Sequence, residues 1–158
     1  GKETKNLHST NWIDKVGYLM KKNNLLDESI FTNITLEFNK ENIDKKLINQ
    51  IFDKTGLREL INSLPEGMDT RIGENGFALS GGERQRIGIA RLLYAKKEIL
   101  IFDESTSNLD NKNKEKFIST INQLAKEKTI IIISHDENVI KNCKKKYIVK
   151  EKKLIKIN

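Results

Sequence analysis

The sequence predicts an α/β fold in which part of the sheet is parallel. Two short runs, 99–102 and 130–133, are apolar at every position, as expected of strands buried on both faces. The segment between them, 111–126, has the apolar spacing of an amphipathic helix. Its apolar face consists of Phe117, Ile118, Ile121 and Leu124. A strand, a helix and a strand in this order predict a right-handed βαβ crossover.

The polar segment before this crossover is predicted to contain short helices. In the first of them, apolar residues recur one helical turn apart: Leu47, Ile48, Ile51 and Phe52. Gly56 can end that helix, and a second one, 57–64, is predicted to stop at Pro65. A longer helix, 83–94, leads into the first buried strand. After the crossover, two runs flank a charged turn and predict a hairpin, 147–149 and 154–157.

The composition is that of an ordinary globular domain with a positive balance. The 158 residues include 29 Lys and Arg against 22 Asp and Glu, and 37% are hydrophobic, enough for a core. A basic balance can mark a nucleic-acid or membrane-surface binder. Many of the lysines lie between 141 and 156, where Tyr147 is the one aromatic residue, which favours a solvated surface.

Two further properties concern the environment that we expect for the chain. Its single cysteine, Cys143, cannot form an internal disulfide, which favours a reducing compartment. No apolar run approaches the roughly 18 residues of a membrane span. We therefore expect an intracellular domain or a piece of one.

Polar residues follow both buried strands. Asp103 and Glu104 end the first, and 134–136, a Ser-His-Asp run, ends the second. Parallel strands joined by a crossover bring these ends to one edge of the sheet. One carboxylate can hold Mg²⁺ while its neighbour polarises a water, and a histidine can contact a terminal phosphate. Strands also end in polar residues merely because they end at solvent. These residues alone therefore do not indicate a phosphate site.

The segment 79–86 combines a helix cap with two glycines. Ser80 and Glu83 have the spacing of a capping box. A capping box does not need Gly81 and Gly82 at its centre. Without side chains, these positions let a phosphate approach the backbone N–H groups at the helix start.

Taken together, these motifs resemble those of ATP-binding cassette (ABC) ATPases. Residues 79–86 resemble the family's signature motif, and 99–104 resemble its Walker B strand with the catalytic glutamate. Residues 107–110 are similar to the D-loop, and His135 stands at the position of the switch histidine. Upstream, the segments around 16–34 and 65–76 resemble exporters with fused transmembrane and ATPase parts.

The resemblance implies a role for each matching residue. Asp103 would help to hold Mg²⁺, Glu104 would act on the attacking water, and His135 would contact the γ-phosphate. The signature would bind ATP held mainly by a second ATPase domain, in a head-to-tail dimer; its residues are Ser80, Gly81, Gly82 and Gln85. Asp110 would lie in the dimer interface.

The resemblance also implies an organisation and a location. Residues 1–158 would be the C-terminal part of one nucleotide-binding domain with a P-loop NTPase-like sheet. Residues 22–84 would form a helical subdomain that contacts a transmembrane permease domain, and 85–158 would form part of the α/β catalytic core. The domain would work at the cytoplasmic face of the cell membrane as an ATPase coupled to transport, with no nucleic-acid partner.

Two departures from the family pattern stand out. No Walker A motif, G-x-x-x-x-G-K-[ST], occurs in the 158 residues, so we expect the chain alone not to turn ATP over. Lys21 stands where the family has the Q-loop glutamine, and the nearest glutamine, Gln50, is out of register. A lysine cannot accept a hydrogen bond, and its charge would compete with Mg²⁺.

Two other functions remain open at this point. A chromosome-maintenance or DNA-repair ABC ATPase would also carry a signature and a Walker B strand, but it would insert a long coiled coil where this sequence has no sustained heptads. A non-catalytic regulatory module would explain the missing Walker A motif and Lys21. It would have little use for Glu104 and His135.

Overall fold

A computed structural model gives the structure of residues 10–39, 41 and 43–157. Its centre is a sheet of three parallel strands, which are, in order across the sheet, β1 (Val16–Leu19), β4 (Ile99–Asp103) and β5 (Thr129–Ile133). Helix α6 (Asn111–Leu124) joins β4 to β5. The α/β class with a parallel sheet is therefore confirmed.

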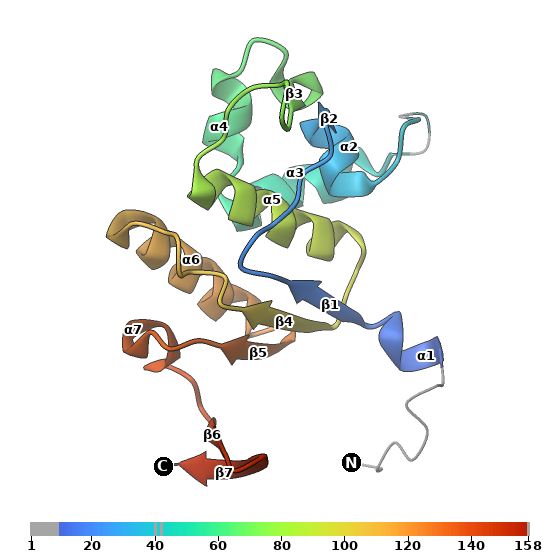
Figure 1. Ribbon diagram of the computed structural model, residues 1–158. Helices are drawn as coiled ribbons and strands as arrows, with labels where there is room; N and C mark the ends of the chain where they lie inside the picture. Colours follow the sequence, from blue (N-terminus) through green and yellow to red (C-terminus); the bar gives the residue numbers. More distant parts are fainter. Residues whose placement is uncertain (1–9, 40, 42, 158) are drawn as a thin grey trace.

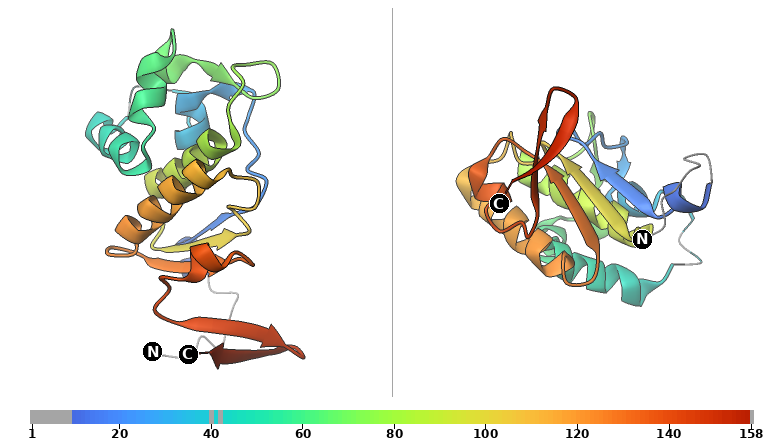
Figure 2. Two further views of the ribbon diagram at one scale, coloured as in Figure 1. Left: turned by 90° about the vertical axis from the view of Figure 1, so that its left-hand side faces the viewer. Right: turned by 90° about the horizontal axis from the view of Figure 1, so that it is seen from below.

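One face of the sheet packs against α6 and α5 (Gly81–Tyr94), which lie side by side across it (Figure 2). On that face Leu100 and Phe102 of β4 are completely buried. The ring of Phe102 meets the edge of Phe117 from α6, with centroids 5.5 Å apart. Aromatic pairs favour this edge-to-face geometry, so the contact locks β4 to the helix that follows it.

The prediction that both faces of β4 and β5 are buried is wrong for one face. Tyr18, Ile131 and Ile133 point to that other face and are 49%, 46% and 49% exposed. Seen from below, the strands lie in front of the helices, and the terminal hairpin of the described residues passes over them (Figure 2). The reason is that no helix of the described residues covers this face.

The residues between β1 and α5 form a helical layer above α5 (Figure 1). Its elements are β2 (Glu28–Ser29), α2 (Ile30–Thr35), α3 (Lys45–Thr55), α4 (Arg58–Ser63), the 3₁₀ helix η1 (Gly67–Asp69) and β3 (Arg71–Ile72). Gly56 ends α3 in the left-handed conformation at φ 65°, as predicted. The second predicted helix, α4, ends before Pro65.

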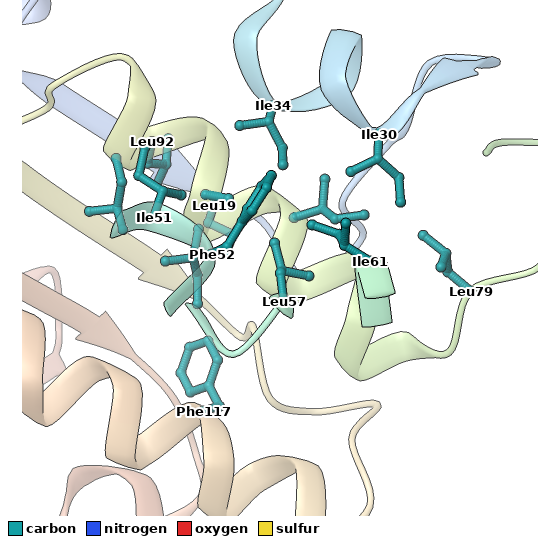
Figure 3. Close-up of a cluster of buried hydrophobic side chains, with 14 of the residues drawn as sticks. Leu19, Ile30, Ile34, Ile51, Phe52, Leu57, Ile61, Leu79, Leu92 and Phe117 are labelled. Atoms are coloured by element: carbon teal, nitrogen blue, oxygen red, sulfur yellow. The ribbon is translucent and has the colours of Figure 1, made fainter. Parts of the chain in front are cut away.

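The hydrophobic core lies between this layer, α5 and the covered face of the sheet. Side chains from α2, α3 and α4 meet Leu92 of α5 and Leu19 of β1, and Phe117 reaches the cluster from α6 (Figure 3). Helix α5 is thus packed between the helical layer on one side and the sheet on the other. Any displacement of α5 must disturb both.

The remaining elements lie at the two ends of the described chain. They are α1 (Thr10–Ile13), α7 (Glu137–Ile140), β6 (Lys146–Lys150) and β7 (Lys153–Ile157). Strands β6 and β7 pair antiparallel, which confirms the predicted hairpin. The hairpin stands apart below the sheet (Figure 1).

None of the helices described here has the length and apolar composition needed to cross a membrane.

Candidate functional site

A hollow of about 460 Å³ lies at the carboxyl edge of the sheet. The residues that line it are Met20, Lys21, Lys22, Asn24, Asp103 and Glu104. The predicted metal ligand Asp103 and the predicted catalytic residue Glu104 therefore share one hollow with Lys21. Parallel α/β sheets bind their ligands at this edge.

Asp103 is the last residue of β4, and its carboxylate is held from β1. The Tyr18 hydroxyl donates to Asp103 Oδ2, and this hydrogen bond raises the pKa of Tyr18 above its ordinary value. Asp103 Oδ1 has no hydrogen-bond partner among the described residues. Tyr18 was not singled out from the sequence, because the contact joins residues 85 positions apart.

The donor set at this edge fits Mg²⁺ better than a metal that needs several protein ligands. The described part of the chain contains no group of three or more His, Cys, Asp or Glu residues that could hold a metal. Mg²⁺ is commonly bound through one or two carboxylates together with waters and substrate phosphates. Asp103, which lines the hollow and whose Oδ1 has no hydrogen-bond partner among the described residues, meets that requirement.

Glu104 is held in an unusual backbone conformation beside the end of β5. Its φ is +47°, in the left-handed region that few non-glycine residues adopt. Its N–H donates to the Ile133 carbonyl at 2.9 Å, and its carbonyl accepts from Ser107. The backbone of this strained residue is fixed at both its N–H and its carbonyl group.

The structure brings Glu104 and His135 together. The His135 N–H donates to Glu104 Oε1 at 3.2 Å, and His135 Nε2 lies 3.7 Å from the same oxygen. The imidazole is 99% exposed, so it is accessible to a phosphate that enters from solvent. Next to it, Asp136 caps α7 and pairs with Lys114 at 2.7 Å, which holds the pKa of Asp136 below its usual value.

The signature residues lie at the start of α5. The predicted capping box is confirmed: the Ser80 N–H donates to Glu83 Oε2 at 2.7 Å, and the Glu83 N–H donates to Ser80 Oγ. Gly81 is exposed, and a Cβ there would make ordinary van der Waals contacts. Gly82 is buried, and a Cβ there would lie 2.5 Å from Asn113 Oδ1. The second glycine therefore makes room for a side chain of α6.

Asp110 is the N-cap of α6 and lies next to the start of α5. Its carboxylate accepts from the Asn113 N–H at 2.9 Å and from Asn113 Nδ2 at 2.7 Å, and these bonds hold the pKa of Asp110 below its usual value. Asn113 Oδ1 accepts in turn from Arg86 Nη1. Asn113 thus ties Asp110, predicted to belong to the D-loop, to α5. An Asn three residues after an Asp cap was the available sequence signal.

The side chain of Gln85 binds the backbone carbonyl of Lys21. Gln85 lies in the second turn of α5, is only 5% exposed, and donates from Nε2 to the Lys21 carbonyl at 3.0 Å. The side chain predicted to contact a nucleotide is therefore buried and bonded within the chain. Lys21 itself is one of the residues that line the hollow.

Comparison with protein families and curated proteins gives a consistent result. Residues 1–107 match the family model described as ABC transporter. The chain is 36% identical over 150 residues to the alpha-hemolysin translocation ATP-binding protein HlyB of Escherichia coli. It is 41% identical over 147 residues to the toxin RTX-I translocation ATP-binding protein of Actinobacillus pleuropneumoniae.

A third relative and a solved structure extend the comparison. The chain is 32% identical over 155 residues to the ATP-dependent lipid A-core flippase of Photobacterium profundum. These three alignments cover 94%, 92% and 98% of the chain but only 21%, 20% and 26% of the relatives. A bacterial Atm1-family ABC exporter solved with ATP bound matches 90% of the chain and 25% of its own, with a TM-score of 0.76 and 30% identity.

Proposed function

The chain belongs to the ABC transporter family, and from this premise we propose that it forms part of a nucleotide-binding domain that couples Mg-ATP hydrolysis to export. The observation that carries the proposal is the arrangement of Asp103, Glu104 and His135 at one edge of the sheet, with both carboxylates lining the hollow. Relatives named as translocation ATP-binding proteins and as a flippase support transport as the process.

Each of these residues has a distinct role in the proposed reaction. Glu104 accepts a proton from the attacking water or orients it, and the His135 N–H holds its carboxylate in place. The exposed imidazole of His135 donates to the γ-phosphate. Asp103 would hold Mg²⁺. When bound, Mg²⁺ neutralises charge on the phosphate oxygens.

A second domain is proposed to complete the site. Ser80 and Gly81 lie at the exposed start of α5, where the helix dipole favours a phosphate. Together with Gly82 they would bind ATP held mainly by a second ATPase domain arranged head to tail. Asp110, tied to α5 through Asn113, would lie in that interface.

The remaining proposals concern organisation. Residues 22–84 act as a helical subdomain that contacts a transmembrane permease domain, and 85–158 supply part of the catalytic core. The domain works at the cytoplasmic face of the cell membrane. Because residues 1–158 contain no Walker A motif to cradle the phosphates, we propose that they do not hydrolyse ATP by themselves.

Complementation between two altered chains tests the shared site. The full-length protein that the gene encodes, called the gene-encoded protein below, is produced with two different tags. One chain carries Glu104→Gln and the other carries Ser80→Arg, and pairs that contain one chain of each kind are purified. One composite site then keeps both an intact Glu104 and an intact Ser80, so we expect phosphate release to persist.

The control pair carries both substitutions on one chain and none on the other. Each composite site then contains one substitution, and phosphate release should fall to the level of Glu104→Gln alone. Equal rates in the two kinds of mixed pair would contradict a site shared between two domains.

A further inference from the structure

The segment 20–24, which we call the rim segment, forms one wall of the hollow and is tied to α5. Gln85 Nε2 donates to the Lys21 carbonyl at 3.0 Å. Asn23 Nδ2 donates to the Arg84 carbonyl at 2.6 Å. Both bonds connect the rim segment to Arg84 and Gln85 of α5, so the helix supports the part of the hollow's lining that this segment provides.

A glycine lets the two parts approach closely. A Cβ on Gly88 would lie 2.4 Å from Leu19 Cδ1 and 2.6 Å from Asn23 Nδ2. Contacts below 3 Å would force one of these side chains to move. The rim segment therefore rests against the α5 backbone at Gly88, one turn beyond the two hydrogen bonds.

The buried amide of Gln85 carries a free-energy penalty that an apolar side chain at this position would not carry. It is 95% buried, and its Oε1 has no hydrogen-bond partner among the described residues. Burying an amide oxygen without a partner is unfavourable, whereas an apolar side chain of the same length would carry no such penalty. The function of the amide must come from its donor, which is bonded to the Lys21 carbonyl.

We propose that Gln85 is a positioning residue that holds the rim segment to α5, so that the shape of the hollow follows the placement of this helix. The same helix carries Ser80 and Gly81 at its exposed start. The effect of a ligand bound at that end would then be transmitted through α5 and Gln85 to the rim segment. This segment lines the hollow together with Asp103 and Glu104. The consequence for ATP hydrolysis rests on the proposed function, but the attachment of the rim segment does not.

Limited proteolysis of the gene-encoded protein tests the attachment without nucleotide. Gln85→Met keeps the length of the side chain and removes the donor. Gln123→Met changes an exposed glutamine of α6 and serves as the matched control. Papain cleavage within 20–24 is measured by mass spectrometry relative to cleavage at the hairpin turn, 151–152, in the same sample.

Loss of one hydrogen bond should raise this ratio about fivefold in Gln85→Met, because cleavage follows the population of the detached segment. The ratio should not change in Gln123→Met. An unchanged ratio in Gln85→Met would overturn the proposal, and so would a general increase at all cleavage sites, which indicates a role in packing alone.

Gln85→Glu provides a second variant with a different signature. Its carboxylate cannot donate at pH 8, but burial raises the pKa of a carboxyl group, and the protonated form at about pH 5.5 can donate to the Lys21 carbonyl. The cleavage ratio should therefore return toward the unaltered value at the lower pH in Gln85→Glu and not in Gln85→Met. Identical pH profiles for the two variants would overturn the proposal.

The effect on the hollow is measured by the Mg²⁺ dependence of ATP hydrolysis. Gln85→Met should raise the Mg²⁺ concentration for half-maximal rate about fivefold, the factor expected for one hydrogen bond, while Gln123→Met leaves it unchanged. A detached rim segment with unaltered Mg²⁺ dependence would overturn the link to the hollow. Failure of the unaltered protein to hydrolyse ATP would instead refute the proposed function, and the proteolysis result would stand.

Discussion

Asn33 should be one of the most sensitive positions for stability, although it lies outside the site. The residue is completely buried in α2. Its Oδ1 accepts from the Leu26 N–H at 2.8 Å, and its Nδ2 lies 3.0 to 3.2 Å from three carbonyl oxygens, those of Leu26, Glu28 and Ser29. The side chain therefore satisfies the backbone where the chain enters the helical layer.

The expected loss for Asn33→Leu follows from these bonds. The two N–H groups of the amide and the two bonds that its oxygen accepts, from the Leu26 N–H and from Arg91 Nη2 at 3.3 Å, amount to about four hydrogen bonds, each with a net contribution of about 1 kcal/mol. Leucine has a similar size, so a cavity contributes little. We expect the free energy of unfolding to fall by about 4 kcal/mol, equivalent to about 8–16 °C in Tm for a domain of this size.

Differential scanning fluorimetry of the gene-encoded protein measures this shift, with Asn122→Leu as the control. Asn122 is an exposed residue of α6, and its replacement should change Tm by no more than about 2 °C. A loss below about 1 kcal/mol for Asn33→Leu would refute the reasoning, because the backbone groups would then find other partners.

Three further perturbations have defined outcomes. Phe102→Ala removes a completely buried ring and its contact with α6, and should lower the free energy of unfolding by about 3–5 kcal/mol in chemical denaturation; a loss below 1 kcal/mol would contradict the described core. Lys114→Met removes the partner that depresses the pKa of Asp136, so it should lower the free energy of unfolding at neutral pH. The difference in this free energy from the unaltered protein should vanish as the pH falls below the usual aspartate range and through the depressed pKa. A difference that does not depend on pH would exclude this ion pair as the cause. Lys21→Gln replaces a positive charge on the rim of the hollow and should lower the Mg²⁺ concentration needed for half-maximal ATP hydrolysis, and an unchanged requirement would make the departure from the family pattern irrelevant.

The sequence predicted those parts of the fold that rest on local patterns. Helix α6 and the two strands that it joins follow from apolar spacing alone, and so does the terminal hairpin. Strand β1 was missed because Gly17 interrupts its short apolar run. That glycine is required by packing, since a Cβ there would lie 2.9 Å from Leu92 Cδ2. The open face of the sheet was also missed, because apolar strands do not reveal what covers them.

The contacts of the candidate site also fall into two groups, those that the sequence could predict and those that it could not. The proximity of Glu104 and His135 could be predicted, because topology alone brings the ends of parallel strands together. The bond between Tyr18 and Asp103 and the bond between Gln85 and Lys21 join residues 85 and 64 positions apart. Such contacts depend on how α5 and β1 pack, which no local pattern contains.

Phosphate release from Mg-ATP by the gene-encoded protein, compared with its Glu104→Gln variant, tests the proposed catalytic role most directly. Glu115→Gln, on the exposed face of α6, provides the charge-matched control. If Glu104 acts on the attacking water, its replacement should lower the rate by about 100-fold or more while ATP still binds, and the control should keep the full rate. A Glu104→Gln variant that releases phosphate as fast as the control would contradict the proposed mechanism.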